Sequence, residues 1–412
     1  MKRITLDRDV LRLFDNLISL SVLKVFNLAL PFLMLPYLIK VLGLEVYGLI
    51  IMSLSLIQLF QSITDYGFNY FATKQVAQHR SSKKQINYIY SKIMATQLLL
   101  ILVCLLPYTV AVIYIPQLAS HKVFYFVSFV TLIFQTLQPE WFFRGVERMR
   151  YITILNLSIK VMLLIGVYLF IKDKDDYILY PVINSVACFV IMLLSHMVLR
   201  KKFIVNPVVI SIKHVVKTLK IGFSYFVNQF APNLYNSLAN LLVGMILGSN
   251  AAGIFGAIRQ IVSLLGVLNI VVSTVFYPYL SRNKDKFFVY SLCYIPLFLG
   301  ACIVLLLLHN IIFDFLGINS SEAFIVMFIL VVGVFFIALQ SVYSTNYLLI
   351  NAYANLAMKI TLYSSIIGFI CIYPLIYNFG LIGAAMGIFL SQFLMGAMAF
   401  TSYFKKRKLV SC

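Results

Sequence analysis

The chain has 412 residues, of which 62% are hydrophobic and only 11% are charged, and its mean hydropathy is +0.96. Soluble domains carry about 25% charged and about 45 to 50% apolar residues. This composition excludes a soluble globular fold. A net charge of +20 would suggest nucleic-acid binding in a soluble protein, so the positions of the 33 Lys and Arg residues must decide what the charge means here.

Apolar runs long enough to cross a bilayer recur along the whole chain. A hydrocarbon core of about 30 Å requires about 20 residues of helix. The runs therefore predict an all-α polytopic membrane protein with about twelve transmembrane helices. We place these helices at 16–40, 46–71, 92–116, 122–143, 151–171, 177–199, 220–247, 252–280, 287–313, 323–350, 356–377 and 380–404.

The basic residues separate by side of the membrane. Of the 33, 26 lie in the N-terminal segment, the C-terminal tail and the loops on the same side, and four lie on the opposite side. The other three lie inside apolar runs. Because short loops rich in Lys and Arg stay in the cytoplasm, we expect an inner-membrane protein with both termini cytoplasmic. The charge then indicates contact with anionic phospholipids, and no nucleic acid is expected as a partner.

A short glycine pattern repeats near the midpoint of the chain. Val41-Leu42-Gly43 followed by Gly48 recurs as Ile246-Leu247-Gly248 followed by Gly253, at an offset of 205 residues. Six helices return the chain to its starting side, so the halves would form a parallel repeat about a pseudo-two-fold axis. We expect an N-terminal lobe at 1–199, a basic cytoplasmic linker at 200–219 and a C-terminal lobe at 220–412.

Four predicted helices carry polar side chains at helical spacing, which marks a face turned away from lipid. One hypothesis is a hydrated cavity whose amides and hydroxyls bind sugar hydroxyls. The alternative is hydrogen bonding between helices, worth about 0.6 kcal/mol per bond. The four stripes are Gln58, Ser62, Asp65 and Asn69; Thr131, Gln135 and Gln138; Gln229, Asn233, Asn236 and Asn240; and Gln340, Ser344, Tyr347 and Asn351.

Three cations inside apolar runs, Lys24, Lys160 and Arg259, are candidate ligands for an anion. An unpaired lysine at the bilayer centre costs at least about 2.5 kcal/mol, so such a group should face water or an anion. A pyrophosphate would suit several cations, because Lys and Arg both bind phosphate oxygens through charge-assisted bonds. The alternatives are an internal carboxylate partner or, for Arg259 and Lys160, extension toward an interface. Asp65 and Glu140 are candidate proton or sodium sites, with a structural role as the alternative.

The sequence contains no catalytic or cofactor motif that we recognise. The five His and six Cys residues show no metal-ligand spacing, and no Walker A glycine loop is present. The predicted loops are too short to hold a soluble catalytic domain. We therefore expect a protein that is not an enzyme, with no catalytic residue, no metal and no cofactor.

Two stretches at predicted helix ends resemble a known family. The first is DYGFNYFATK at residues 65–74, and the second is PEWFFRGVERM at residues 139–149. Both resemble segments of bacterial polysaccharide-export flippases of the Wzx type. These flippases belong to the multidrug/oligosaccharidyl-lipid/polysaccharide superfamily. The helix number, the two-lobed repeat and the cytoplasmic termini extend the similarity across nearly the whole chain.

The resemblance implies a MATE-like, V-shaped pair of six-helix lobes that opens alternately to the two sides of the membrane. It implies flipping of undecaprenyl-pyrophosphate-linked oligosaccharide to the periplasmic face, for O-antigen (lipopolysaccharide) or other surface polysaccharide synthesis. A cationic cavity and coupling to a proton or sodium gradient would fit this function. The partners implied are the lipid-linked oligosaccharide, a polysaccharide polymerase and chain-length machinery. Arg144 and Glu147 are candidates for a gate pair, with a solvated loop as the alternative.

Other functions stay open at this point. A multidrug and toxin extruder of the same superfamily shares the helix number and fold, although this chain has few acids in its apolar runs to hold cationic drugs. A lipid II flippase is close in function but usually has fourteen helices. A membrane glycosyltransferase or polysaccharide polymerase would act on the same lipid-linked sugars, but it would usually need a large loop or a carboxylate base.

Overall fold

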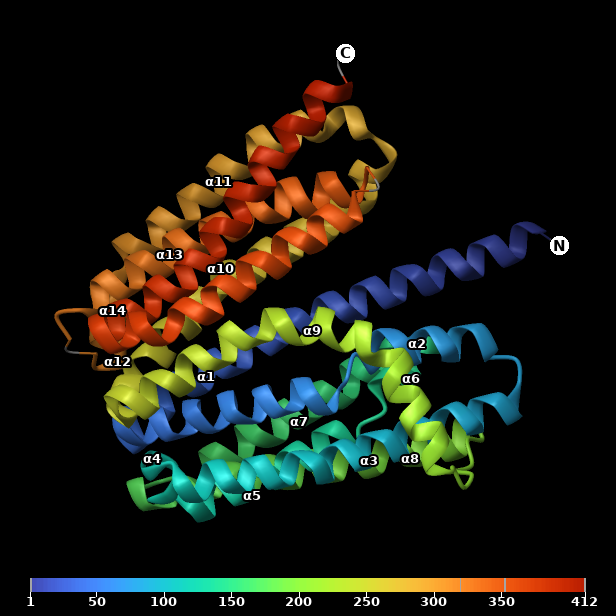
Figure 1. Cartoon of the computed structure of the whole chain (residues 1–412), viewed down its shortest axis with the longest axis horizontal. Coiled ribbons are helices and arrows are strands. Elements are labelled where there is room, and N and C mark those ends of the chain that lie inside the picture. The colour runs from blue at the N-terminus through green and yellow to red at the C-terminus, as the bar shows by residue number, and fades with distance from the viewer. Residues whose placement is uncertain (1, 319, 352, 411–412) are drawn as a thin grey trace. The chain divides into compact units, whose positions relative to one another are not determined.

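The computed structural model describes the backbone of residues 2–318, 320–351 and 353–410. Side chains are described at Phe26 and from residue 32 to residue 406, apart from positions 224, 228, 231–235, 274, 278, 319, 352 and 354. Within these residues, all regular structure is helical, as the composition predicted (Figure 1).

Helices follow one another with short connections (Figure 1). In chain order they are α1 (Lys2–Thr64), α2 (Phe68–His79), α3 (Lys83–Tyr114), α4 (Pro116–Ala119), α5 (Lys122–Thr136), α6 (Glu140–Gly145), α7 (Met149–Phe170), η1 (Lys174–Ile178), α8 (Leu179–Lys202), α9 (Ile212–Leu247), α10 (Ser249–Arg282), η2 (Lys284–Lys286), α11 (Phe287–Leu307), α12 (His309–Leu316), α13 (Ala323–Gln340), η3 (Ser341–Leu349) and α14 (Ala354–Val410). Each of the twelve predicted runs lies on one or more of these helical segments.

Eight helical stretches of the described residues are long and apolar enough to cross a membrane. The protein is therefore a multi-pass membrane protein. Two of the predicted runs lie on α14. The candidate span on this helix is Asn355–Lys406, which has 52 residues. Gly380 interrupts the helical backbone there with φ 57° and ψ −134°, so α14 comprises two successive helices.

Two predicted helices end earlier in the structure than the hydropathy suggested. The helix predicted at 46–71 stops at Thr64, because Tyr66 and Gly67 adopt positive φ values of 42° and 71°. The helix predicted at 122–143 stops at Thr136, and a new short helix begins after Pro139. Proline lacks the N–H that a continuing helix would need. Both breaks fall beside the two motifs that carry the family resemblance.

The chain divides into two compact units. Unit 1 comprises Met1–Met34 and Ser53–Phe230, and unit 2 comprises Leu35–Met52 and Ala231–Cys412. The lobe boundaries and the linker predicted from the sequence stay a prediction, as does the V-shaped arrangement of the lobes.

The glycine turns of the predicted repeat share one backbone conformation. Gly43 has φ 79° and ψ 166°, and Gly248 has φ 94° and ψ 167°. These values are accessible to glycine and costly for other residues. Both turns separate consecutive helices, so equivalent positions of the two halves break the helix in the same way.

The helices that follow these turns approach each other closely within unit 2. A Cβ added to Gly48 would overlap the carbonyl oxygen of Ser249, and a Cβ added to Gly253 would overlap the carbonyl oxygen of Leu44. Leu44 and Ser249 are themselves 205 residues apart, so the two contacts are equivalent. Such reciprocity is what a pseudo-two-fold axis passing between Gly48 and Gly253 produces.

Unit 2 also contains a buried hydrogen-bond network around η3, a π-helix. Asn269 of α10 donates to Ser341 Oγ at 2.8 Å and accepts from the Tyr294 hydroxyl at 2.8 Å. Asn346 of η3 donates to the Tyr290 hydroxyl at 2.9 Å. Both asparagines are at most 1% exposed. These neutral bonds satisfy polar groups that would be costly in an apolar interior.

Candidate functional site

The two family motifs meet in one hydrophobic core of unit 1. Phe68 and Phe71 of α2 pack in the same cluster as Trp141, Phe142 and Phe143 of α6, and all five side chains are buried. Such aromatic side chains each remove a large apolar area from water. The motifs are far apart in sequence but form a single structural feature.

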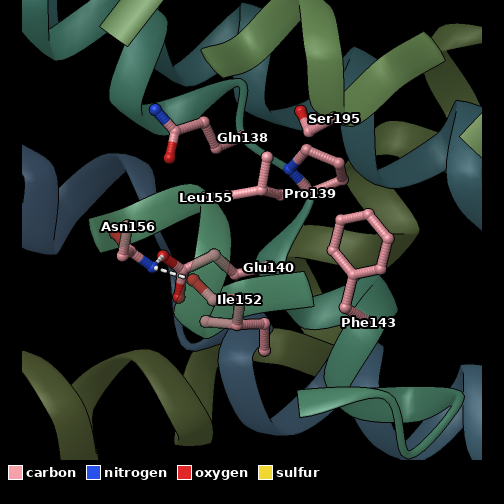
Figure 2. Close-up of a pocket in the computed structure, with 8 residues that line it drawn as sticks. All are labelled: Gln138, Pro139, Glu140, Phe143, Ile152, Leu155, Asn156 and Ser195. Carbon is pink, nitrogen blue, oxygen red and sulfur yellow. Dashed lines mark hydrogen bonds between the residues drawn. The ribbon is translucent and has the colours of Figure 1, made fainter. Parts of the chain in front are cut away.

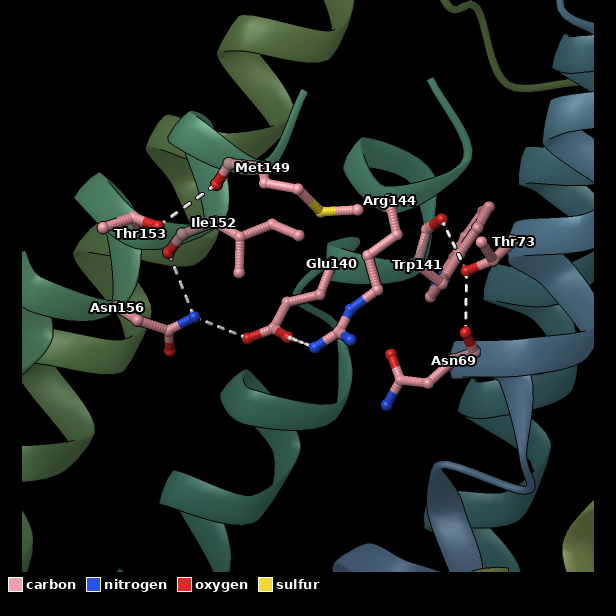
Figure 3. A network of polar contacts seen from close by, with 9 residues as sticks. All are labelled: Asn69, Thr73, Glu140, Trp141, Arg144, Met149, Ile152, Thr153 and Asn156. Atoms are coloured by element: carbon pink, nitrogen blue, oxygen red, sulfur yellow. Dashed lines mark hydrogen bonds and ion pairs between the residues drawn. The ribbon is translucent and has the colours of Figure 1, made fainter. Parts of the chain in front are cut away.

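Backbone contacts fix α6 against α2. The Thr73 hydroxyl donates to the carbonyl oxygen of Trp141 at 3.1 Å, as well as to that of Asn69 within its own helix at 2.8 Å (Figure 3). A Cβ at Gly145 would lie 2.5 Å from Val76 Cβ, so the two helices approach this closely only because residue 145 is glycine. The position of Glu140 and Arg144 on α6 is thereby tied to α2.

The turn after α1 is held by the first part of α9, also in unit 1. The Tyr66 hydroxyl donates to the Leu219 carbonyl oxygen at 3.2 Å, and its ring stacks on Phe226 with 4.8 Å between centroids. A Cβ at Gly67 would lie 2.7 Å from the Tyr225 carbonyl carbon. These contacts stabilise a backbone conformation that is unfavourable for Tyr66, and they fix the adjacent Asp65.

Four polar residues, which we call the Asp65 cluster, lie at this junction: Asp65, Glu140, Arg144 and Asn156. Asn156 Nδ2 of α7 donates to Glu140 Oε1 at 2.7 Å, and Arg144 Nη2 lies 3.3 Å from Glu140 Oε2 (Figure 3). The side chains of Glu140 and Arg144 are 30% and 36% exposed. With both acids ionised the cluster has a net charge of −1, and one proton makes it neutral.

The surroundings of Asp65 shift its protonation equilibrium. Asp65 directly follows the candidate membrane span Phe32–Thr64 and is half-buried. Loss of water raises the pKa of Asp65 to about 7, helped by the Glu140 carboxylate and opposed by the Arg144 guanidinium. A carboxyl group with such a pKa changes charge near neutral pH.

A small hollow adjoins Glu140. It is partly open to solvent and leaves room for about one water molecule. The Gln138 side chain lines it, and Gln138 Nε2 is buried with no hydrogen-bond partner among the described residues. A hollow with an unsatisfied donor and a carboxylate can hold water or a small polar group. Figure 2 shows its lining residues: Gln138, Pro139, Glu140, Phe143, Ile152, Leu155, Asn156 and Ser195.

In unit 2 the structure brings Arg259 together with two residues of the predicted polar stripe, Asn236 and Asn240. Arg259 Nη1 donates to the Asn236 carbonyl oxygen at 2.8 Å and to Asn240 Oδ1 at 3.0 Å. Arg259 Nη2 donates to Asn236 Oδ1 at 3.2 Å. The guanidinium also lies 6.0 Å from the centroid of the Phe255 ring. Oxygen atoms of the two asparagines orient this guanidinium, so we call Asn236, Asn240 and Arg259 the Arg259 cluster.

Lys160 of α7 lies near Cys188 of α8 in unit 1, close enough for the two to interact electrostatically. Gln135, another predicted cavity residue, donates to Cys188 Sγ at 3.6 Å. Lys160 is half-buried and forms no ion pair with any residue that the structure describes. Lys160 and Gln135 therefore share one polar patch inside the helices of unit 1.

The remaining predicted residues are more scattered. Gln58 is exposed, and Gln229 and Gln340 are half-buried. The side chains of Lys24 and Asn233 lie outside the described residues.

Each of the two gate candidates has an ion-pair partner other than the one the sequence suggested. Arg144 pairs with Glu140 at 3.3 Å, and Glu147 pairs with Arg80 at 3.0 Å. Across the described residues, no group of three or more His, Cys, Asp and Glu side chains is placed to hold a metal ion.

Sequence reasoning missed Asn156 as well as the buried pair Asn269 and Asn346. Asn269 and Ser273 stand four residues apart, as do Tyr290 and Tyr294, so a helical polar stripe was present in both segments. The stripe through Gln340 was assigned with α-helical spacing, but η3 is a π-helix with a longer period. Ser344 of that stripe is buried, but the stripe did not include Asn346, which is also buried.

Comparison with known proteins now identifies the family. The model of the family "Polysaccharide biosynthesis protein" matches residues 13–284, about two thirds of the chain, so the chain belongs to this family. The resemblance to polysaccharide-export flippases that the two motifs suggested is thereby confirmed.

The chain is also similar to individual proteins over nearly its full length. It is 27% identical to a protein of Escherichia coli (strain K12) named "Putative O-antigen transporter", over 98% of this chain and 99% of the relative. A Shigella dysenteriae protein of the same name is 23% identical, over 92% and 97% of the two chains.

Solved structures show the same fold at low sequence identity. The lipid II flippase MurJ in an inward closed conformation matches with a TM-score of 0.71 and 14% identity, over 93% of this chain and 86% of that one. An inward-facing multidrug resistance MATE family transporter of the MOP superfamily matches with a TM-score of 0.65 and 13% identity, over 94% and 98%. The fold is therefore MATE-like, as predicted.

Proposed function

We propose that this protein flips undecaprenyl-pyrophosphate-linked oligosaccharide repeat units from the cytoplasmic to the periplasmic leaflet of the inner membrane, for O-antigen or other surface polysaccharide synthesis. It works by alternating access between lobes at 1–199 and 220–412, with both termini and the basic linker at 200–219 in the cytoplasm. It catalyses no covalent reaction. A polysaccharide polymerase and chain-length machinery receive its product.

One observation carries this proposal. The chain is similar from end to end to proteins named O-antigen transporters, and its two most recognisable motifs form one buried junction. A lipid-linked sugar requires a path that accepts a charged phosphate and many hydroxyls within a hydrophobic protein. Polar groups inside spans that face a bundle interior supply such a path.

The Arg259 cluster is suited to the pyrophosphate. Oxygen atoms of Asn236 and Asn240 hold the Arg259 guanidinium in a fixed orientation. Guanidinium groups bind phosphate oxygens with two parallel hydrogen bonds. Lys24 and Lys160 would add charge along the same path, and the amides of the polar stripes would bond sugar hydroxyls.

The Asp65 cluster is suited to coupling with a proton gradient. One proton on Asp65 changes the cluster between a net charge of −1 and neutrality, and this change falls near neutral pH. The cluster joins the end of α1 to α6 and α7, so its charge can bias the packing of three elements. A proton is thus the coupling ion that we propose, with sodium as the alternative.

The test is flipping by the purified protein in liposomes. A fluorescent undecaprenyl-pyrophosphate oligosaccharide is reconstituted, and its exposure to a membrane-impermeant quencher is followed over time, with and without an imposed proton or sodium gradient. Wild type should accelerate flipping over protein-free liposomes. Arg259→Gln should lose most of this acceleration, whereas Arg282→Gln, which removes one exposed cation from the same helix, should retain it.

The outcomes separate the parts of the proposal. If wild type and Arg259→Gln accelerate flipping equally, the role of the Arg259 cluster is refuted. The proposal that the protein flips this substrate is then retained. No acceleration under any gradient would refute flipping of this substrate. If the protein is folded but does not accelerate flipping, it would next be tested as a drug extruder by measuring efflux of a fluorescent cation.

A further inference from the structure

Two parts of unit 1 carry positive charge with no acid of their own. Residues 66–139 contain six Lys and Arg residues and no Asp or Glu. Residues 177–230 contain another six Lys and Arg residues and again no Asp or Glu. Where these two segments meet, neither can neutralise the other.

The structure brings them together along α3. The segment between α8 and α9 lies on this helix: Asn206 N donates to Asn87 Oδ1 at 3.0 Å, and Val208 N donates to Ser91 Oγ at 2.7 Å. The start of α9 continues the contact, with the His214 ring edge-on to Tyr88 at 5.7 Å between centroids. This connection is therefore a docked part of unit 1.

The docking places Lys92 of α3 and Lys217 of α9 within electrostatic range of each other. Lys92 of α3 is half-buried, and the Lys217 ammonium of α9 repels it. Lys92 Nζ lies 3.0 Å from Gln75 Oε1 and 5.3 Å from the centroid of the Tyr88 ring. Among the residues that the structure describes, neither Lys92 nor Lys217 forms an ion pair.

A like-charge pair of this kind is unfavourable unless an anion lies between or beside the two charges. An amide oxygen and an aromatic ring hold Lys92 in place, but neither carries the full negative charge that would offset the repulsion. Lys92 also belongs to the candidate membrane span Lys83–Tyr114, in its third turn. A lipid phosphate at the end of this span is an anion that can reach both ammonium groups.

We propose that Lys92 and Lys217 form a binding site for the anionic phosphate of a lipid headgroup. Tyr88, which is 36% exposed, and Gln75 complete the site as an aromatic and an amide neighbour. The site lies in unit 1 and shares no residue with the Arg259 cluster, which belongs to unit 2. Its ligand is either the pyrophosphate of a lipid-linked substrate or an anionic phospholipid.

The opposing explanation is that both lysines are solvated surface cations whose effect is no more than general attraction to a negative surface. Lys83 and Lys84 provide the matched comparison. Both are exposed at the first turn of α3, so removing them lowers the net charge of the protein by the same amount as removing Lys92 and Lys217. A specific site responds to the Lys92 and Lys217 pair alone.

Binding is measured by microscale thermophoresis on the full-length protein in detergent. The probes are dihexanoyl phosphatidylglycerol, farnesyl pyrophosphate and, as the zwitterionic comparison, dihexanoyl phosphatidylcholine. Wild type should bind at least one anionic probe more tightly than phosphatidylcholine. Lys92→Gln with Lys217→Gln should weaken that binding about tenfold or more, because two charge-assisted contacts are lost. Lys83→Gln with Lys84→Gln should weaken it by less than about twofold.

Preference for farnesyl pyrophosphate would identify a substrate-docking site, and preference for phosphatidylglycerol would identify a bound phospholipid. Equal weakening by the two double variants, or no preference over phosphatidylcholine, would overturn the proposal. Lys92→Arg with Lys217→Arg should restore binding and shows that charge is the cause, since a folding defect of the Gln variants would not depend on charge. The assay needs no transport, so its result is independent of whether the protein flips oligosaccharides.

Discussion

Unit 1 and unit 2 both bury polar side chains between helices, but with different chemistry. The Asp65 cluster of unit 1 contains two acids and a guanidinium, two of them about one-third exposed. The network around η3 in unit 2 consists of neutral amides and hydroxyls, with Asn269 and Asn346 fully buried. The first can change charge near neutral pH and the second cannot. The difference indicates that unit 1 responds to protons, whereas hydrogen bonds that are insensitive to pH fix the packing of unit 2.

The largest effect is expected where unit 2 relies on close backbone approach. Gly253→Ala should destabilise the protein by about 3 kcal/mol, because the new methyl group meets the rigid carbonyl of Leu44. Thermal unfolding in detergent and the yield of folded protein are the measurements. Gly266→Ala, on the same helix with no heavy atom within 4 Å of its Cβ, is the control and should be neutral or stabilising. Equal stability of the two variants would contradict the close contact.

The next prediction tests the response of unit 1 to pH. Asp65 has a folded pKa of about 7 against 3.8 for the free group, so between these values only the folded chain holds the proton. The stability of wild type should therefore fall as pH rises from about 4 to about 7 and stay lower above that. Asp65→Asn removes this loss and should be more stable than wild type at pH 8 by about 1 to 3 kcal/mol, with a smaller gain at pH 5.

Thermal unfolding of both proteins at pH 5 and pH 8 measures this difference. Asp314→Asn, which removes an exposed acid of unit 2, is the control and should show no such pH-dependent gain. A gain from Asp65→Asn of the same size at both pH values would show that Asp65 does not hold a proton in the folded protein.

A smaller and pH-independent effect is expected in unit 2. Asn269→Leu leaves the Tyr294 hydroxyl and the Ser341 hydroxyl without their shared partner, and should cost about 1 kcal/mol. The loss should be the same at pH 5 and pH 8. Ser263→Ala, which removes a hydroxyl bonded only within its own helix, should have little effect. If the stability lost in Asn269→Leu depended on pH, unit 2 would also respond to protons, which would contradict the proposed difference between the units.

The smallest effect is expected at the surface ion pair of unit 1. Arg80→Ala removes the partner of Glu147, but both side chains are about half exposed, so the change in stability should stay below about 0.5 kcal/mol. Flipping should also continue at nearly the wild-type rate. A large loss of flipping with unchanged stability would instead support a gating role for Glu147.

The sequence predicted the helices and the repeat well because both depend on local patterns. Hydropathy located the helical runs, and the two glycine turns were recognisable because positive φ restricts the residue type. Asn236 and Asn240 were assigned to one helical face, and in the structure both contact Arg259, a contact that the sequence did not predict. The convergence of the two motifs in one core could not be read from spacing, because it depends on packing between α2 and α6.

Other features escaped prediction for identifiable physical reasons. The π-helix of η3 shifts its side chains out of α-helical phase, so the stripe through Gln340 missed Asn346. The pairing of Arg144 with Glu140 depends on a short helix that begins only because Pro139 ends the preceding element. Residues 206 and 208 dock on α3 through their backbone N–H groups. Every residue except proline has such a group, so the side-chain pattern could not predict this contact.

The boundaries of the two units have a practical consequence for cutting the chain. A protease cleaving at the exposed Val209 would leave a first fragment that includes Leu35–Met52, a part of unit 2, and a second fragment that includes residues 212–230, a part of unit 1. Each fragment thus completes the other's hydrophobic core. The nicked protein should migrate as one particle in gel filtration, and two co-expressed fragments should assemble into it without a covalent link.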